Sequence, residues 1–134
     1  MRTDSLKAWL AAAVIVHFAV SVVHGVAHSG AHVSLTPAAL TFVIIVIQLG
    51  PLVGLALTRI RPRAGAAVVA LSMAGSLLFG VVNHFLLPGS DHVSQVDPGW
   101  RALFGSTAAL LALVEAGGTI VGAVAVRRYA RRLA

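Results

Sequence analysis

Cysteine is absent from the 134 residues of this chain, and only four residues are acidic. Without a thiol, the chain has no disulfide, no thiolate metal site, no cysteine-ligated iron–sulfur cluster and no cysteine nucleophile. Charged residues make up 10% of the sequence and hydrophobic residues 58%, whereas an ordinary soluble domain has about 25% charged residues. A soluble domain of this size needs a larger polar surface. We therefore interpret the chain as an all-α integral membrane protein.

Four apolar runs make up most of the chain, and each approaches the roughly 20 residues that a helix needs to cross a bilayer. The runs lack the two-residue alternation of strands, so helices are expected. Thr36–Pro37 and Asp97–Pro98 each place a capping residue and a first-turn proline before a run. The predicted spans form a single domain and cover residues 8–27, 38–58, 64–87 and 100–126.

Basic residues are distributed unevenly around these spans. All but Arg101 lie at the N-terminus, in the turn between the second and third spans, or in the C-terminal tail. By the positive-inside rule, both termini are predicted to be cytoplasmic, and the fold to be an antiparallel four-helix bundle in the cell membrane. The net charge of +6 is explained by this placement. We therefore expect a lipid bilayer as the partner, and no nucleic acid.

Small residues recur at helical spacing in the second and fourth runs. Gly50 and Gly54 form one glycine pair, and Gly118 and Gly122 form another. Such pairs allow helices in a membrane to approach closely. They predict tight packing within the bundle, a homo-oligomer, or docking into a larger membrane complex. Pro51 lies inside the second run and is expected to kink that helix, because it removes a backbone hydrogen bond.

The six histidines outnumber all the acidic residues together. At about 100° per residue, His17, His24 and His28 fall within roughly 40° of arc on the first helix. Polar side chains in a membrane helix normally face the protein interior. We therefore expect this stripe to point into the bundle.

One buried polar layer is predicted near the middle of the membrane. Glu115 is the only acid within an apolar run, about 15 residues or roughly 22 Å from the start of the fourth span. His17 and Gln48 lie at a similar depth on the first and second helices. Burial of a lone carboxylate is costly, so Glu115 should have a partner. The layer is either a hydrogen-bond network that fixes helix register, or a proton relay or ion-binding layer.

A second, richer layer is predicted at the outer mouth of the bundle. Histidine is the commonest transition-metal ligand, and two histidines one helical turn apart can bind one ion. Nitrogen and oxygen ligands suit zinc, copper(II), nickel or iron, whereas soft copper(I) is disfavoured without thiolates. We expect His32 to be a solvated loop residue. The predicted ligands of a non-haem transition-metal site are His24, His28, His84, Asp91 and His92.

Several other functions remain open at this stage. His24 and His84 are predicted at similar depths, so they are also candidate axial ligands of a b-type haem in a membrane cytochrome. The chain is alternatively a structural or accessory subunit of a larger membrane complex. A small transporter that uses Glu115 for proton coupling is a further alternative. No hydrolase or phosphate-binding motif is present, and whether the chain is an enzyme stays undecided.

Overall fold

The structure is a computed structural model that describes residues 3–131. Within these residues, four helical stretches are long and apolar enough to cross a membrane, which confirms an all-helical chain with four candidate spans. Their bounds lie within four residues of the predicted ones. The elements in chain order are α1 (Thr3–Gly30), α2 (Pro37–Phe42), the π-helical segment η1 (Val43–Leu49), α3 (Gly50–Leu57), α4 (Pro62–Val81), the π-helical segment η2 (Val82–Leu86) and α5 (Pro98–Ala130).

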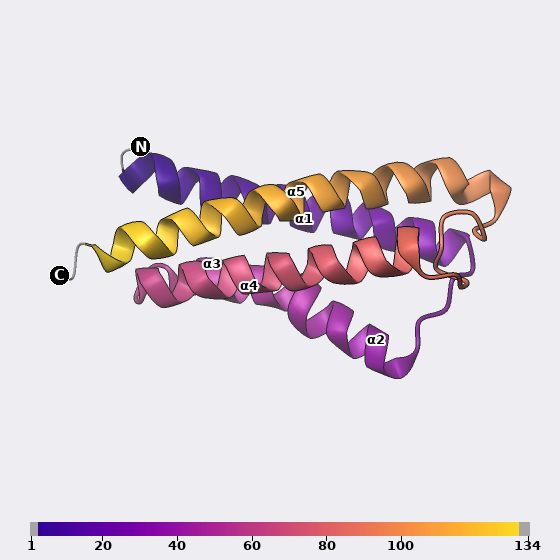
Figure 1. Cartoon of the computed structure of the whole chain (residues 1–134), viewed down its shortest axis with the longest axis horizontal. Helices are drawn as coiled ribbons and strands as arrows, with labels where there is room; N and C mark the ends of the chain where they lie inside the picture. The colour runs from indigo at the N-terminus through magenta and orange to yellow at the C-terminus, as the bar shows by residue number, and fades with distance from the viewer. Residues whose placement is uncertain (1–2, 132–134) are drawn as a thin grey trace.

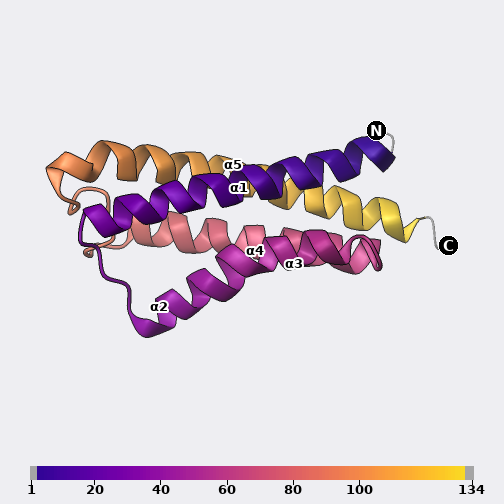
Figure 2. The same ribbon diagram turned by 180° about the vertical axis from the view of Figure 1, so that it is seen from behind.

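The helices lie lengthwise beside one another (Figure 1). The start of α1, the end of α5 and the turn between α3 and α4 lie at one end, which we call the terminal end. The loops 31–36 and 87–97 lie at the other, which we call the loop end. Helix α5 packs against both α1 and α4, and α4 also packs against α3. Helix α2 diverges from the other helices towards the loop end (Figure 2).

The ends of the helices follow from local sequence signals. The side chain of Thr36 accepts a hydrogen bond from the backbone N–H of Ala39, and Asp97 caps α5 in the same way; both predicted caps are confirmed. Helix α1 ends at Gly30, and His32, two residues later, has a positive φ of 54°. The N–H of the next residue, Val33, bonds back to the carbonyl of His28 at 3.0 Å. This is the Schellman arrangement, in which a left-handed residue ends a helix.

The second span changes direction close to Pro51 (Figure 2). Pro51 has no N–H to donate, and its ring conflicts with the regular helical carbonyl one turn earlier. The preceding residue, Gly50, bonds five residues back to Ile45, which is the π-helical pattern. Pro51 and Gly54 in α3 are buried, whereas α2 and η1 contain no buried residue within the described chain. The proline therefore separates a packed half of the span from a diverging half.

Both predicted glycine pairs pack against α4 within the chain. A Cβ atom on Gly54 would lie 2.8 Å from the backbone nitrogen of Val69. A Cβ atom on Gly122 would lie 2.8 Å from Cβ of Ala70. These contacts account for both pairs without a second copy of the chain. A homo-oligomer or a larger complex stays a prediction.

The larger apolar core cluster occupies the terminal end, and a smaller one, of Ala27, Val96 and Phe104, lies at the loop end. Side chains of α1, α4 and α5 interlock at the terminal end and leave at most 7% of any of them exposed. Because α1, α4 and α5 approach closely at this end, they hold the polar residues beyond the core in fixed positions. We call this group the terminal-end core; it consists of Leu6, Leu10, Val14, Ala66, Val69, Met73, Ala125 and Tyr129.

Candidate metal centre

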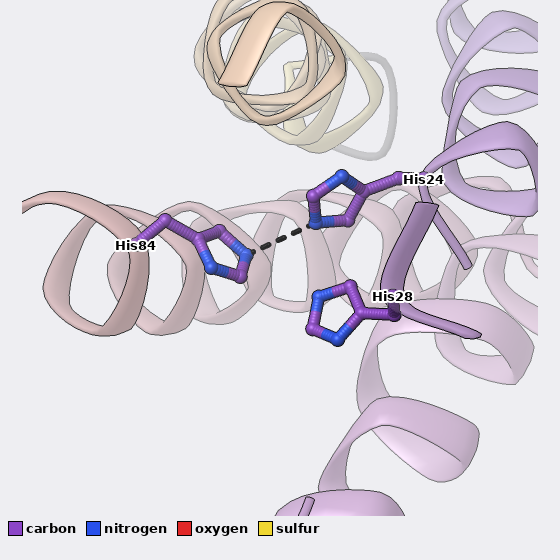
Figure 3. A group of neighbouring side chains, drawn as sticks. All are labelled: His24, His28 and His84. Atoms are coloured by element: carbon purple, nitrogen blue, oxygen red, sulfur yellow. Dashed lines mark hydrogen bonds between the residues drawn. The ribbon is translucent and has the colours of Figure 1, made fainter. Parts of the chain in front are cut away.

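Three histidines converge near the loop end of the molecule. His24 and His28 lie one turn apart on α1, and His84 faces them from η2 (Figure 3). One ring nitrogen from each lies within 4.8 Å of those of the other two. His24 and His84 are each 6% exposed, and His28 is half-buried. We call these residues the three-histidine group. Their ring nitrogens are close enough together to hold one metal ion.

The π-helical segment η2 sets the position of His84. The N–H of Leu87 bonds to the carbonyl of Val82, five residues earlier, instead of four. A π turn is wider than an α turn and rotates the side chains that follow it, and such turns are frequent at functional sites. Leu87 then becomes extended before Pro88, which ends the helix. His84 is therefore presented to α1 by a local irregularity.

A hydrogen bond with Thr107 of α5 orients the His24 ring. Nδ1 of His24 lies 2.8 Å from the Thr107 hydroxyl oxygen. That hydroxyl also lies 2.7 Å from the Leu103 carbonyl and 3.1 Å from the Phe104 carbonyl. When it donates to one of these carbonyls, it accepts from Nδ1 of His24, and Nε2 of a neutral His24 keeps a lone pair.

Asp91 orients the His84 ring, as Thr107 orients the His24 ring. Nδ1 of His84 bonds to the Asp91 backbone carbonyl at 3.1 Å, and the Asp91 carboxylate oxygen Oδ1 also lies 3.1 Å away. The backbone carbonyl is an acceptor, so Nδ1 carries the hydrogen and Nε2 of a neutral His84 keeps a lone pair. The Nε2 atoms of His24 and His84 face one another at 3.2 Å. This contact is a hydrogen bond when one of the two Nε2 atoms carries a hydrogen, and when both have a lone pair they can bind one cation.

Two buried atoms in this region have no hydrogen-bond partner among the described residues. Asp91 Oδ1 lies 3.3 Å from Nε2 of His28, yet it accepts no hydrogen bond from any described residue. Nδ1 of His28 is likewise buried without a partner in residues 3–131. Buried polar atoms are nearly always satisfied in native proteins. An anionic oxygen and imidazole nitrogens left together in this way form a suitable donor set for a cation.

Phe104 of α5 supports all three rings. Its ring centroid lies 4.8 Å from that of His24, 4.9 Å from His28 and 5.1 Å from His84. Phe104 is completely buried. Our sequence reasoning missed the supporting roles of Phe104 and Thr107. Their three-residue spacing, which puts both on one face of the fourth span, was the available signal.

The other histidines near the loop end lie outside this group. The ring nitrogens of His92 lie 2.8 Å from the Ser94 hydroxyl and 3.3 Å from the Phe85 carbonyl. A role for His92 as a ligand stays a prediction. His32 is exposed and lies in the loop that follows α1.

The buried polar layer predicted near the middle of the membrane contains a close pair. Nε2 of His17 lies 3.1 Å from Oε1 of Glu115, and these residues are 1% and 3% exposed. Gln48 lies beside Ser21, with 3.1 Å between its Oε1 and the serine hydroxyl oxygen. The structure therefore joins His17 to Glu115 and links Gln48 to the same face of α1 through Ser21.

A cavity of about 340 Å³ connects the two layers. The three-histidine group lines one part of it, and Gln48 and Glu115 line another. Its remaining wall is mostly apolar and includes Leu40, Val43 and Ile47 of the diverging second span. The volume lies within the range of small-ligand pockets, about 300–1,000 Å³.

Comparisons with protein families, with curated proteins and with solved structures found no match for this chain. Its function is therefore argued from its own geometry. Four apolar helices and a three-histidine group fit a small membrane protein with a metal-binding site.

Proposed function

We propose that this chain is a membrane protein that binds a non-haem transition-metal ion through His24, His28 and His84. The observation that carries the proposal is the convergence of one ring nitrogen from each histidine within 4.8 Å, with the Nε2 atoms of His24 and His84 3.2 Å apart. Tetrahedral zinc with bonds of about 2.0–2.1 Å places neighbouring ligand nitrogens about 3.3 Å apart. Hydrogen bonds to Nδ1 of ligating histidines, such as those from His24 and His84, are typical of metal sites.

Several divalent ions suit this donor set. Three imidazoles and a nearby carboxylate match the preferences of zinc, copper(II), nickel and iron. Three protein ligands leave one position open, as in catalytic zinc sites, and Asp91 or His92 is the proposed fourth ligand. The three-histidine group lines the cavity, so an open position would be accessible to a small molecule.

The proposed arrangement in the membrane is an antiparallel four-helix bundle with both termini in the cytoplasm. The turn between α3 and α4 and the last turn of α5 bring arginines to the terminal end. Arg101, at the loop end, donates to the carbonyls of Ser94 and Val96, so its charge has a local structural role. The positive-inside rule then places the loop end, with the metal site, on the outer face of the cell membrane.

The haem alternative fits this geometry less well. A haem with His24 and His84 as axial ligands needs a porphyrin between the two rings. Those rings are in edge contact, with centroids 4.9 Å apart, and Phe104 packs against both. A porphyrin would require the helices to separate. An absorption spectrum without a Soret band would exclude it.

The direct test is a zinc titration of the purified full chain, with elemental analysis of the protein as isolated. We expect one tightly bound ion per wild-type chain, and its loss in the His24→Ala, His84→Ala double variant. His32→Gly is the matched control, because it removes an exposed histidine outside the group. Circular dichroism should show unchanged helix content in every variant. Equal zinc binding by the wild type and the double variant would overturn the proposal.

A further inference from the structure

Glu115 is an unusual residue for its position in the chain. Its side chain is 3% exposed and lies within a candidate span, where burying a charge is costly. Acidic residues inside membrane spans commonly mark ion pathways or proton relays. Glu115 is not a ligand of the metal site proposed above, so the burial of Glu115 needs another explanation.

A polar stripe connects Glu115 to the three-histidine group. His17, Ser21 and His24 follow one another along the buried face of α1. Seven residues separate His17 from His24, which corresponds to about 10 Å along a helix. Glu115 and the histidines line the same cavity, so an ion at the three-histidine group has a direct route to the carboxylate.

The donors around Glu115 are suited to a cation. His17 Nε2 lies 3.1 Å from the carboxylate, and Gln48 Oε1 and the Ser21 hydroxyl line the same cavity. Among the described residues, His17 from α1 and Glu115 from α5 are the titratable groups in this layer. Gln48 from the second span and Ser76 from α4 are neutral. A cation here would meet one carboxylate, and no cationic arginine or lysine lines the cavity.

The path ends just beyond this pair. The terminal-end core begins at Val14, one turn from His17 on α1, and Val14, Val69 and Met73 are fully buried. None of these core residues lines the cavity, whereas Glu115 and the three histidines do. Glu115 is therefore reached through the cavity from the side of the histidines.

We propose that His17 and Glu115 form a second cation site, filled through the cavity by the same divalent metal that the three-histidine group binds. The inference rests on the proposed function. The metal would bind the Glu115 carboxylate and His17 Nε2, and any proton that the pair shares would leave through the cavity. The chain would then contain a two-site cation pathway that reaches the middle of the membrane from the loop end.

The test counts zinc ions per chain by calorimetric titration of the full protein in lipid nanodiscs. We expect two zinc ions per wild-type chain, of which the one at His17 and Glu115 is bound more weakly. Glu115→Gln should bind one ion, at unchanged high affinity. Gln keeps the shape of the side chain and can still hydrogen-bond to His17, so the bundle should fold. His17→Gln provides an independent test of the same site.

The outcomes separate this inference from the proposed function. A wild-type chain that binds only one ion overturns the second site alone, as does a Glu115→Gln variant that still binds two. The His24→Ala, His84→Ala variant should lose the tight ion and fill the remaining site more slowly. A wild-type chain that binds no zinc overturns both proposals. If Glu115→Gln loses its helix content, the result from His17→Gln decides.

Discussion

The terminal end and the loop end of this molecule are built from the same helices but packed in opposite ways. At the terminal end, α1 contributes Leu6, Leu10 and Val14 to a core from which water is excluded. One turn further along the same face, α1 contributes His17, Ser21 and His24. There the second span diverges and a cavity opens. One helix face thus changes from apolar and tightly packed to polar and loosely packed.

This difference shows how a small membrane protein can position a metal-binding site. Close contacts at the terminal end hold α1, α4 and α5 together. The loop end can then keep unsatisfied nitrogens and a cavity, which cost stability. The site therefore depends on the terminal-end core for its position, and four changes test that dependence.

The largest effect is expected from a methyl group added at the terminal end. A Cβ atom on Gly65 would meet backbone atoms, including Gly54 O at 2.6 Å and Leu57 C at 2.8 Å. Backbone cannot move aside easily, so Gly65→Ala should destabilise the fold by about 3 kcal/mol. Gly25→Ala at the loop end is the control, because its Cβ would meet nothing within 4 Å. Thermal unfolding in detergent should separate them, and equal losses would contradict the contrast between the ends.

The next effect concerns zinc itself. A ligand that binds only the folded state at 100 times its dissociation constant stabilises that state by about 2.7 kcal/mol. Zinc should therefore raise the unfolding temperature of the wild type, and a chelator should reverse the shift. The His24→Ala, His84→Ala variant loses the tight site, so its shift should be much smaller. A shift of equal size in that variant would place the bound zinc elsewhere.

A smaller effect is expected from the residue that orients His24. Thr107→Val keeps the shape of the side chain but removes the hydroxyl that forms a hydrogen bond with Nδ1. Loss of such a supporting hydrogen bond commonly weakens metal binding by about 10–100-fold. Zinc affinity should fall by that factor while the number of ions per chain stays the same. Ser106→Ala, on the exposed side of the same helix, is the control and should leave the affinity unchanged.

The smallest effect is expected at the end of α1. His32 has a left-handed backbone conformation, which glycine adopts without steric cost. His32→Gly should leave zinc binding unchanged and raise stability by about 1 kcal/mol or less. A loss of zinc from this variant would extend the metal site into the loop.

Much of this description was predictable from single residues and their spacing. Low charge and four apolar runs indicated four helical spans, and Thr36 and Asp97 indicated where two of them begin. The pairing of His17 with Glu115 followed from depth along two helices. The π turn at His84 was not predictable, because no residue type requires it. The place of His92 beside Ser94 and Phe85 depended on the path of a loop.

Four apolar helices and a histidine stripe on one face of α1 follow from the amino-acid sequence alone. Helical periodicity and hydropathy act within a single segment, so they can be read without neighbours. Which histidines come into contact depends on how the helices pack against one another. The same packing lets Thr107 and Asp91 orient the rings of His24 and His84, whose Nε2 atoms lie 3.2 Å apart. Those contacts join residues 60 and 83 positions apart. Their geometry depends on the packing of separate helices, which the spacing of residues along one helix does not encode.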